Sequence, residues 1–451
     1  MPEDEKGYLA GYAQRAGRSN RIEAGYFDRF DVKRGLRNSD GTGVLVGLTT
    51  IGNVHGYILD EKEKVAVPGQ LFYRGYDLAE LAGGFQNDGR PGFEEVIFLL
   101  LFGELPTASE LAEFSSYLGA KRNLPQHFIE DMILKAPSPD VMNKLARSVL
   151  ACYSYDPNPE DLSLENVLRQ CLELIARFPV MVAQGYQAKR RYYDGKSLII
   201  HTPDPNLSTA ENFLTMIRHD RHYTPLEAET LDLCFVIHSE HGGGNNSTFS
   251  IHVITSTETD CYSAIAAAVG SLKGLKHGGA NIKVWQMMND LKEHVSHWEN
   301  EAEIRDYLRT ILAGEAFDRT GLVYGMGHAV YTLSDPRAEL LRRKAEYLAR
   351  EKKREEEFAL FERVARLVPE VFREEKKSGK ILAPNVDYFS GFVYDMLNIP
   401  TALYTPIFAI SRVAGWCAHL MEERVAGGRI VRPAYKNVIH QKEYVALERR
   451  G

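Results

Sequence analysis

The chain is poor in cysteine, and the few cysteines it has do not stand in pairs. None is spaced as C-x-x-C. A disulfide framework or a cysteine zinc site is therefore not expected, and a reducing compartment fits this usage best. The five cysteines are Cys152, Cys171, Cys234, Cys261 and Cys417.

The sequence also lacks a long apolar run. The uncharged stretch that includes residues 401–411 stops at Arg412, short of the roughly 20 residues that a membrane-crossing helix needs. The N-terminus, MPEDEKGYLAGYAQRAG, has no apolar core of the kind found in secretory signals. We therefore expect a cytoplasmic protein that does not enter a membrane.

Neither sign of charge dominates. The chain carries 54 Lys and Arg against 61 Asp and Glu, a formal net charge of −7 over 451 residues. Nucleic acids and membrane surfaces both favour basic chains, so neither is an expected partner, which leaves open a local basic pocket for a phosphorylated ligand. Hydrophobic residues make up 44% of the chain, which is enough for a large core, and the length allows up to about three domains.

Strand patterns are confined to residues 41–75, where VLVGLTT, GYILD and VAVPGQLFY alternate with glycine and proline. They predict a small sheet or hairpins. The rest reads as helix: residues 93–102 form a buried apolar run, and residues 161–184 carry apolar side chains at helical spacing. Residues 336–377 predict two solvated helices broken near Pro369. The expected fold class is mainly α with a minor N-terminal β element.

Four polar segments interrupt the helical pattern. They are HSEHGGGNNS at 238–247, LKHGGAN at 275–281, GMGHAVYTLSDPRA at 325–338 and PNVDYFSG at 384–391. Glycines beside a histidine let the backbone bend sharply and bring N–H groups close to a ligand. A helix that starts after such a loop favours a negative group and lowers the pKa of a nearby histidine.

Each polar segment also has an ordinary explanation. A single histidine among glycines is more often a loop or capping residue than a catalyst, and an aspartate before aromatic residues is usually a cap. His238 and His241 stand three residues apart and could share a metal, but the sequence offers no third ligand and no H-E-x-x-H motif. No metal site is expected, and the four segments are informative only together.

Taken together, these segments resemble citrate synthase and its relative 2-methylcitrate synthase in order and spacing. The similarity extends to PGQLFYRGYDLAELA, STETDCYSAIAAAVGSLKGLKHGGAN, TPIFAISRVAGWCAHLMEE and RIVRP, and so covers most of the chain. The resemblance implies a citrate-synthase-like, two-domain helical fold that forms a homodimer. Its large domain would comprise residues 1–277 and 387–451, and a small domain of residues 278–386 would close over the active-site cleft.

The resemblance also implies roles for three catalytic residues. His277 in KHGGAN matches the histidine that polarises the thioester carbonyl. His328 in GMGH matches the histidine that binds and protonates the oxo group of oxaloacetate. Asp387 in PNVD matches the base that removes a proton from the acetyl methyl group.

The oxaloacetate pocket carries over in the same way. His241 and Asn245 match positions that line it, and Arg337 and Arg412 match arginines that clamp the substrate carboxylates. Arg432 in IVRP matches a third clamp, which the family supplies from the partner subunit. The resemblance therefore makes dimerisation part of the active site.

These residue types suit the reaction on chemical grounds. A carboxylate can deprotonate the weakly acidic methyl group of a thioester only if the developing enolate oxygen is stabilised at the same moment. A neutral histidine can donate that hydrogen bond, and a second histidine serves the oxo group that the enol attacks. Arginine meets each carboxylate with two parallel hydrogen bonds. The chemistry requires no metal or redox cofactor.

The sequence departs from common relatives near the expected CoA site. Ala329 follows His328 where many relatives carry a basic residue, and Thr332 stands where some place an arginine. Other groups must then meet the CoA phosphates. Lys377 and Lys380 are candidates, although a solvated run of charges explains them equally well.

Several alternatives stay open at the level of sequence. A 2-methylcitrate synthase would use propionyl-CoA, and a pocket discriminates one methylene by only about 1–3 kcal/mol. A citryl-CoA lyase would reuse the fold. A non-catalytic ligand-sensing relative would be free to lose Asp387, which this chain retains. A metal-dependent hydrolase would lose its activity in chelator.

Overall fold

The computed structural model describes residues 3–38, 40–60, 63–379 and 381–450 of the chain. They form two compact units, Met1–Leu48 and Thr49–Gly451. The first unit contains α1 (Glu3–Ser19), α2 (Gly25–Arg29) and the short 3-10 helix η1 (Arg34–Leu36). Neither α2 nor η1 buries a residue.

The second unit begins with a three-stranded antiparallel sheet in the order β1-β2-β3. Its hairpin packs against the segment that follows the GMGH motif. A side chain at Gly69 would place its Cβ 2.1 Å from the carbonyl oxygen of Ser334, so only glycine permits this approach. The predicted minor β element is confirmed, but the run VLVGLTT at residues 44–50 is not one of its strands. The strands are β1 (Gly52–Asp60), β2 (Glu63–Tyr73) and β3 (Tyr76–Asp77).

Helices make up most of the second unit, as the sequence predicts. They are α3 (Leu78–Asn87), α4 (Phe93–Phe102), α5 (Ala108–Lys121), η2 (Ile129–Leu134), α6 (Val141–Cys152), η3 (Tyr153–Tyr155), α7 (Leu164–Tyr192), α8 (Thr209–Ile217), α9 (Pro225–His238), α10 (Asn246–Thr255), α11 (Cys261–Lys273), α12 (Ala280–His294), α13 (Glu301–Ala313), α14 (Pro336–Lys352), α15 (Glu355–Lys376), α16 (Val386–Met396), η4 (Thr401–Leu403), α17 (Tyr404–Ala426) and η5 (Leu447–Arg449).

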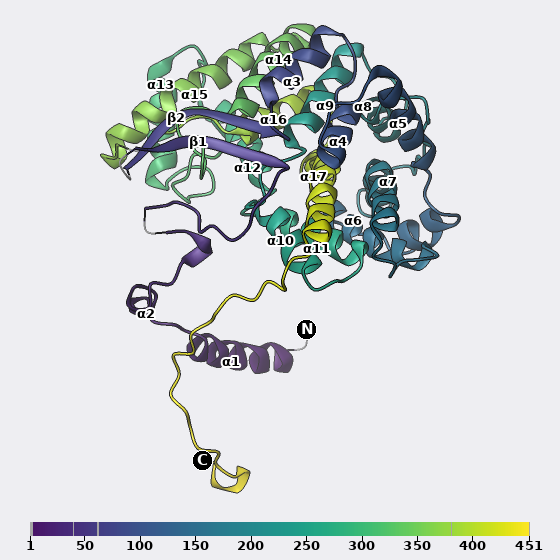
Figure 1. Ribbon diagram of the computed structural model, residues 1–451. Coiled ribbons are helices and arrows are strands. Elements are labelled where there is room, and N and C mark those ends of the chain that lie inside the picture. The colour runs from purple at the N-terminus through teal and green to yellow at the C-terminus, as the bar shows by residue number, and fades with distance from the viewer. Residues whose placement is uncertain (1–2, 39, 61–62, 380, 451) are drawn as a thin grey trace. The chain divides into compact units, whose positions relative to one another are not determined.

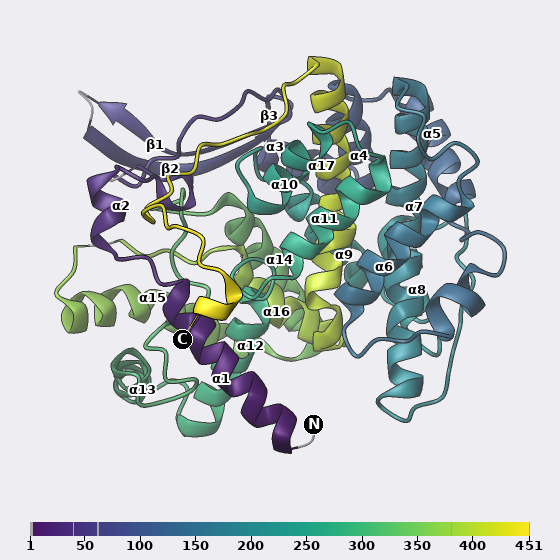
Figure 2. The same ribbon diagram turned by 90° about the horizontal axis from the view of Figure 1, so that it is seen from below.

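Helix α17 runs through the middle of this unit, among α4, α7, α9, α10 and α11 (Figures 1 and 2). It is buried from Tyr404 to Leu420 with few interruptions, and Trp416 is fully enclosed. The apolar run at residues 93–102 is the buried helix α4, as predicted. A helix enclosed on all sides can hold a charged side chain only beside compensating groups, which makes Arg412 on α17 notable.

The predicted break at Pro369 is wrong. Helix α15 continues through Pro369, and the interruption lies earlier, at Lys353, whose left-handed φ of 55° ends α14. A proline removes only one helical hydrogen bond. In α15, the buried residues Leu367, Val368 and Val371 lie on both sides of Pro369, and their packing stabilises the helix through the proline.

Candidate active site

Two of the polar segments pair with each other like short antiparallel strands. Residues 325–327 lie against residues 383–385: the N–H of Gly327 donates to the carbonyl of Ala383 at 2.7 Å, and the N–H of Asn385 donates to the carbonyl of Gly325 at 2.9 Å. This pairing places His328, which directly follows Gly327, beside the start of α16, the helix that carries Asp387.

The glycines of this pair are required by the backbone. Gly325 and Gly327 have φ values of 78° and 84°, a region that side chains rarely adopt. A Cβ at Gly325 would also lie 2.8 Å from the side chain of Val284. The glycines that mark the motif in the sequence therefore serve a tight crossing of two segments.

His328 has a fixed hydrogen-bonding pattern. Its Nδ1 accepts from the backbone N–H groups of Val330 at 3.1 Å and Tyr331 at 3.2 Å. The proton of the neutral ring therefore sits on Nε2, which makes that nitrogen a donor. The ring stacks on Tyr331 with 4.8 Å between centroids and meets the edge of His241 at 5.1 Å.

His241 is buried, and its Nε2 has no hydrogen-bond partner among the described residues. Burial, reinforced by the positive charge of Arg337, lowers the pKa of His241 well below its ordinary value. His328, Arg412 and His277 act on it in the same direction. His241 is therefore neutral at physiological pH and lies where the predicted site residues meet.

Arg337 is buried and already paired. Its Nε and Nη2 donate to the two oxygens of Asp335 at 3.0 and 2.8 Å. Asp335 also accepts from the backbone N–H of Arg337 at 3.0 Å and from that of Val386 at 3.2 Å. One carboxylate thus joins the arginine to the first turns of α14 and α16.

Arg412 is equally buried but pairs differently. Its Nε donates to the carbonyl of His238 at 2.6 Å, whereas both terminal nitrogens are buried without a partner in the described part of the chain. Burial lowers the pKa of Arg412 to about 10, against the opposing charge of Glu240. The side chain therefore stays charged at neutral pH and presents an unused fork of donors, the geometry that binds a carboxylate.

His277 lies between α11 and α12. Its Nε2 is 3.1 Å from both the Oδ1 of Asn245 and the Oγ of Ser247. Burial, and then the charge of Arg412, lowers the pKa of His277 to about 4. The ring is therefore uncharged at neutral pH, as expected of a histidine near the start of a helix.

The neighbours of His277 decide which nitrogen carries its proton. The Oδ1 of Asn245 caps α10 by accepting from the N–H of Ser247 at 3.3 Å, so towards His277 it can only accept. This contact favours a proton on Nε2. The hydroxyl of Ser247 donates to the same Oδ1 at 2.9 Å and accepts from the indole N–H of Trp416 at 3.1 Å, so it too faces His277 as an acceptor and favours a proton on Nε2.

Asp387 occupies the first turn of α16, where Asn385 is the N-cap. A helix N-terminus favours a carboxylate, and the charge of Arg337 acts in the same direction. Burial outweighs both and raises the pKa of Asp387 to about 6. A carboxylate with such a pKa is ionised at neutral pH and is a stronger base than an exposed aspartate.

The structure therefore gathers most of the residues singled out by sequence: His241, Asn245, His277, His328, Arg337, Arg412 and Asp387. Sequence reasoning missed Asp335, Ser247 and Glu240. Asp335 gave a signal, since an aspartate before a proline and an arginine is typical of a helix N-cap.

Three other predicted residues do not join this group within the chain. Arg432 is exposed in the C-terminal segment that follows α17. The backbone N–H of Val431, its neighbour, donates to the hydroxyl of Ser256 at 3.1 Å, at the end of α10. Lys377 is the exposed residue that ends α15, with a left-handed φ of 46°. Lys380 lies outside the described residues.

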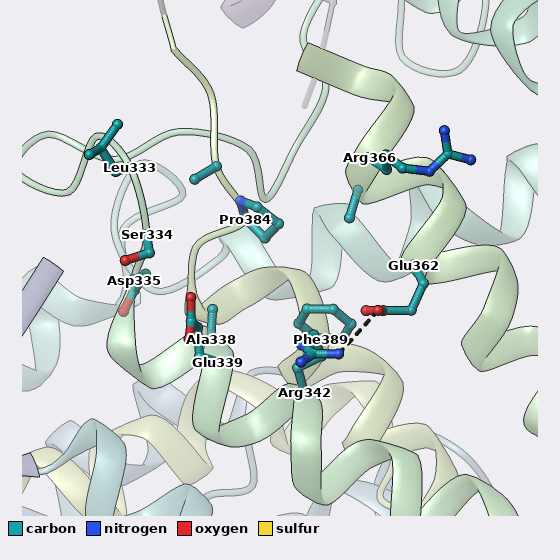
Figure 3. A pocket seen from close by; sticks show the side chains of 12 residues that line it. Leu333, Ser334, Asp335, Ala338, Glu339, Arg342, Glu362, Arg366, Pro384 and Phe389 are labelled. Atoms are coloured by element: carbon teal, nitrogen blue, oxygen red, sulfur yellow. Dashed lines mark hydrogen bonds and ion pairs between the residues drawn. The ribbon is translucent and has the colours of Figure 1, made fainter. Parts of the chain in front are cut away.

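A cavity of about 290 Å³ lies beside Asp335, between α14, α15 and the start of α16 (Figure 3). Its wall includes Asp335 but none of His277, His328 and Asp387. Arg342 lines it and is paired with Glu362 at 3.1 Å. Arginines and carboxylates alternate around the wall, so the cavity does not concentrate the positive charge that CoA phosphates would need.

No helix within the described residues has both the length and the continuous apolar run that crossing a membrane would take.

Comparisons with known proteins find similar sequences over most of the chain. A family model described as citrate synthase, C-terminal domain, matches residues 39–434. Citrate synthase of Haloferax volcanii is 34% identical over 407 residues, which are 89% of this chain and 94% of that protein. The 2-methylcitrate synthase of Shewanella oneidensis is 33% identical and covers 81% of this chain and 87% of its own.

Solved structures show the same fold. Citrate synthase from Pyrobaculum aerophilum superposes with a TM-score of 0.73 at 30% identity, covering 90% of this chain and 94% of that one. The enzyme from Thermoplasma acidophilum, solved as a ternary complex with carboxymethyl coenzyme A and oxaloacetate, gives a TM-score of 0.76 at 25% identity. It covers 93% of this chain and 99% of its own.

Proposed function

This chain belongs to the citrate synthase family, whose members are acyltransferases, and we propose that it condenses acetyl-CoA with oxaloacetate and water to form citrate and CoA. The observation that carries the proposal is the buried, unused donor fork of Arg412 beside two neutral histidines, His241 and His277. An anionic substrate would satisfy this fork, which water cannot reach freely.

Oxaloacetate is the acceptor substrate in this proposal. One carboxylate would bind Arg412, and the other would lie near Arg337, whose pairing with Asp335 fixes the guanidinium in place. His241 and Asn245 would complete the pocket. The Nε2–H of His328 would donate to the oxo group, because the backbone occupies its Nδ1. The bound oxaloacetate of the Thermoplasma enzyme supports this choice of substrate.

The condensation would begin at the acetyl methyl group. Asp387, with its raised pKa, would remove a proton while His277 donates a hydrogen bond to the thioester oxygen. The resulting enol would attack the oxo carbon, and the proton on Nε2 of His328 would neutralise the new alkoxide. Hydrolysis of the citryl thioester would then release CoA and make the reaction irreversible. No step calls for a metal or a redox cofactor.

The assembly and the closure of the site are part of the same proposal. The small domain, residues 278–386, would close over the large domain and exclude water from the enol. Arg432 would reach the site of the partner in a homodimer, which suits an exposed arginine on a segment beyond the last long helix. Lys377 and Lys380 stay candidates for the CoA phosphates, and a cytoplasmic location suits five unpaired cysteines.

A thiol-release assay tests the function. Wild type should release CoA when acetyl-CoA and oxaloacetate are both present, and Asp387→Ala should abolish most of that release. Asp395→Asn is the matched control, since Asp395 lies on the same helix but pairs with Arg354 at 2.7 Å. Failure of wild type to release thiol with either acetyl-CoA or propionyl-CoA would contradict the synthase assignment.

Propionyl-CoA is the second candidate substrate, because a 2-methylcitrate synthase matches nearly as well as the citrate synthases do. The ratio of kcat/KM for the two acyl-CoAs decides between them. A ratio that favours propionyl-CoA would replace citrate by 2-methylcitrate as the product and leave the roles of the residues unchanged.

A further inference from the structure

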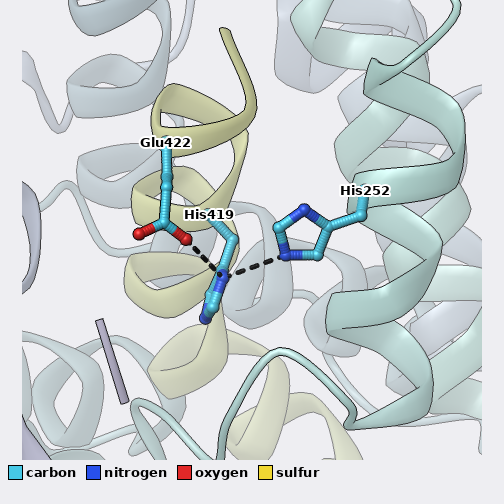
Figure 4. Close-up of side chains that lie close together, drawn as sticks. All are labelled: His252, His419 and Glu422. Atoms are coloured by element: carbon cyan, nitrogen blue, oxygen red, sulfur yellow. Dashed lines mark hydrogen bonds and ion pairs between the residues drawn. The ribbon is translucent and has the colours of Figure 1, made fainter. Parts of the chain in front are cut away.

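A cluster of two histidines and a glutamate lies away from the catalytic residues. His252 on α10 faces His419 and Glu422 on α17 (Figure 4). The Nε2 of His252 is 3.1 Å from the Nδ1 of His419, and the Oε2 of Glu422 is 3.7 Å from that same nitrogen. One ligand atom from each side chain lies within 4.8 Å of the other two.

The outer atom of each side chain is held by another group. The Nε2 of His419 is 3.1 Å from the Oε1 of Glu240, and the Nδ1 of His252 is 2.7 Å from the Oε2 of Glu423. The Oε1 of Glu422 accepts from the N–H and the hydroxyl of Thr50, at 2.7 and 2.8 Å. Histidines that ligate metals usually donate their second ring N–H to a carboxylate in this way.

The protons on the outer ring nitrogens determine what the centre of the cluster can bind. The two outer nitrogens carry N–H groups, because each faces a carboxylate that can only accept. A ring that carries its one proton on the outer nitrogen turns a bare nitrogen towards the other ring. The Oε2 of Glu422 is also buried without a hydrogen-bond partner among the described residues. Three lone pairs converge, so a cation must lie between them, either a shared proton or a metal ion.

We propose that this cluster binds a divalent transition-metal ion through His252, His419 and Glu422. Two imidazoles and a carboxylate suit Zn²⁺. Bond lengths of about 2.0–2.1 Å to a tetrahedral ion place ligand atoms about 3.3 Å apart. Two of the three distances here are 3.1 and 3.7 Å, and the third is within 4.8 Å. The fourth position falls to water.

The ligand set and the access from solvent support a metal ion. The carboxylates of Glu240, Glu422 and Glu423 surround the two rings, while Arg74 acts on Glu240 and Glu422, and Arg412 acts on Glu240. The side chains of His252 and Glu423 are 16% and 17% exposed, so an ion can reach the cluster from solvent. On α17, the i, i+3 spacing of His419 and Glu422 places both ligands on one face.

The metal would have a structural role. It would join α10 to α17 and, through His419, fix Glu240, which also accepts from the backbone N–H of Gly242. Glu240 directly precedes His241, so the site would brace the loop that contributes this residue to the active site. The ion takes no part in the condensation, and its binding can be measured without substrate.

Zinc binding to the whole purified protein tests the proposal. After dialysis against chelator, titration with ZnCl₂ in a calorimeter should show one saturable site per chain and raise the unfolding temperature. His252→Gln and Glu422→Gln should abolish this site. Glu423→Gln, which removes only the negative charge of an outer partner, should weaken zinc binding about 10–100-fold. His297→Gln is the control, because His297 pairs with Glu303 at 2.8 Å on an exposed surface.

Two results would overturn the proposal. One is the absence of saturable zinc binding to wild type, which would leave a proton shared between the rings. The other is binding that survives in both His252→Gln and Glu422→Gln, which would place the zinc elsewhere. Circular dichroism establishes that each variant is folded. If one ligand variant fails to fold, the other and Glu423→Gln still decide the outcome.

Discussion

The two halves of the proposed active site hold their charges in different ways. In the Asp335 region (His328, Asp335, Arg337 and Asp387), the buried arginine is paired at two positions by its own carboxylate. In the Arg412 region (His241, Asn245, Ser247, His277 and Arg412), the arginine donates to one carbonyl, and two of its nitrogens have no hydrogen-bond partner among the residues that the structure describes. The buried arginine of the first region has its carboxylate partner without a ligand, whereas the buried arginine of the second region has donors that a ligand can occupy.

This difference teaches which interactions stabilise the fold and which serve binding. A buried ion pair costs desolvation energy but becomes expensive to break once it is built. A buried charge with unused hydrogen-bond donors has more of that cost left uncompensated, and such groups are commonly found at functional sites. Substitutions in the two regions should therefore separate stability from activity.

The largest expected effect is on catalysis, from Asp387→Asn. Loss of the general base should lower kcat by about 10²–10⁴-fold, measured by thiol release with saturating substrates. In wild type, kcat/KM should fall as pH drops below about 6, because protonation of Asp387 removes the base. An acid limb that persists unchanged in the residual activity of the variant would assign that limb to another group.

The same substitution should stabilise the fold at high pH. The pKa of Asp387 rises from 3.8 in the unfolded chain to about 6 in the folded one. The folded state therefore binds more protons in this window, and the free energy of unfolding falls as pH rises through it. Asp387→Asn removes that loss, so its stability gain over wild type should be larger at pH 8 than at pH 4 in urea unfolding.

Asp335→Asn should cause the largest loss of stability. It leaves Arg337 buried without its carboxylate and should lower the free energy of unfolding by about 3–5 kcal/mol. Denaturant unfolding measures this. Asp318→Asn, which breaks the more exposed pair with Lys283 at 3.1 Å, should cost far less. Equal losses in the two variants would mean that burial of the Asp335–Arg337 pair has no special weight.

Arg412→Met should behave in the opposite way. It removes a buried charge and one hydrogen bond, so stability should change little, while the KM for oxaloacetate should rise. Charged hydrogen bonds are worth about 1.5–3 kcal/mol, so a rise of about 10–150-fold is expected. Arg342→Met is the control, because Arg342 belongs to the neighbouring cavity. An unchanged KM would remove Arg412 from the substrate site.

The smallest effect is expected from Ser247→Ala. The indole N–H of Trp416 would lose its acceptor, which should cost about 1–3 kcal/mol of stability. His277 would lose one of the two oxygens that lie 3.1 Å from its Nε2 and hold the ring in place. We expect a fall in kcat with little change in the KM for oxaloacetate. Ser250→Ala, at an exposed site of the same helix, should change neither quantity.

Much of the fold could be predicted from local patterns. The buried apolar run became α4, and two of the three strand patterns, GYILD and VAVPGQLFY, became part of β1 and β2, because side-chain periodicity reports burial directly. The third, VLVGLTT, did not become a strand. The break near Pro369 could not be predicted correctly. The low helix propensity of proline favours a break there. The packing of the buried side chains around Pro369 stabilises the helix by more than the proline destabilises it, and this packing depends on residues distant in the chain.

The sequence by itself determined the inventory of the site: the histidines, arginines and aspartate, the glycines that let segments cross, and their order along the chain. Only the tertiary structure decided which charges are paired. Asp335 was free to serve as an ordinary helix cap, yet it holds Arg337. Glu240 meets His419 across 179 residues of chain. Local sequence specifies turns and helix starts through backbone geometry, whereas the strength of a charge depends on burial and on partners that only folding brings together.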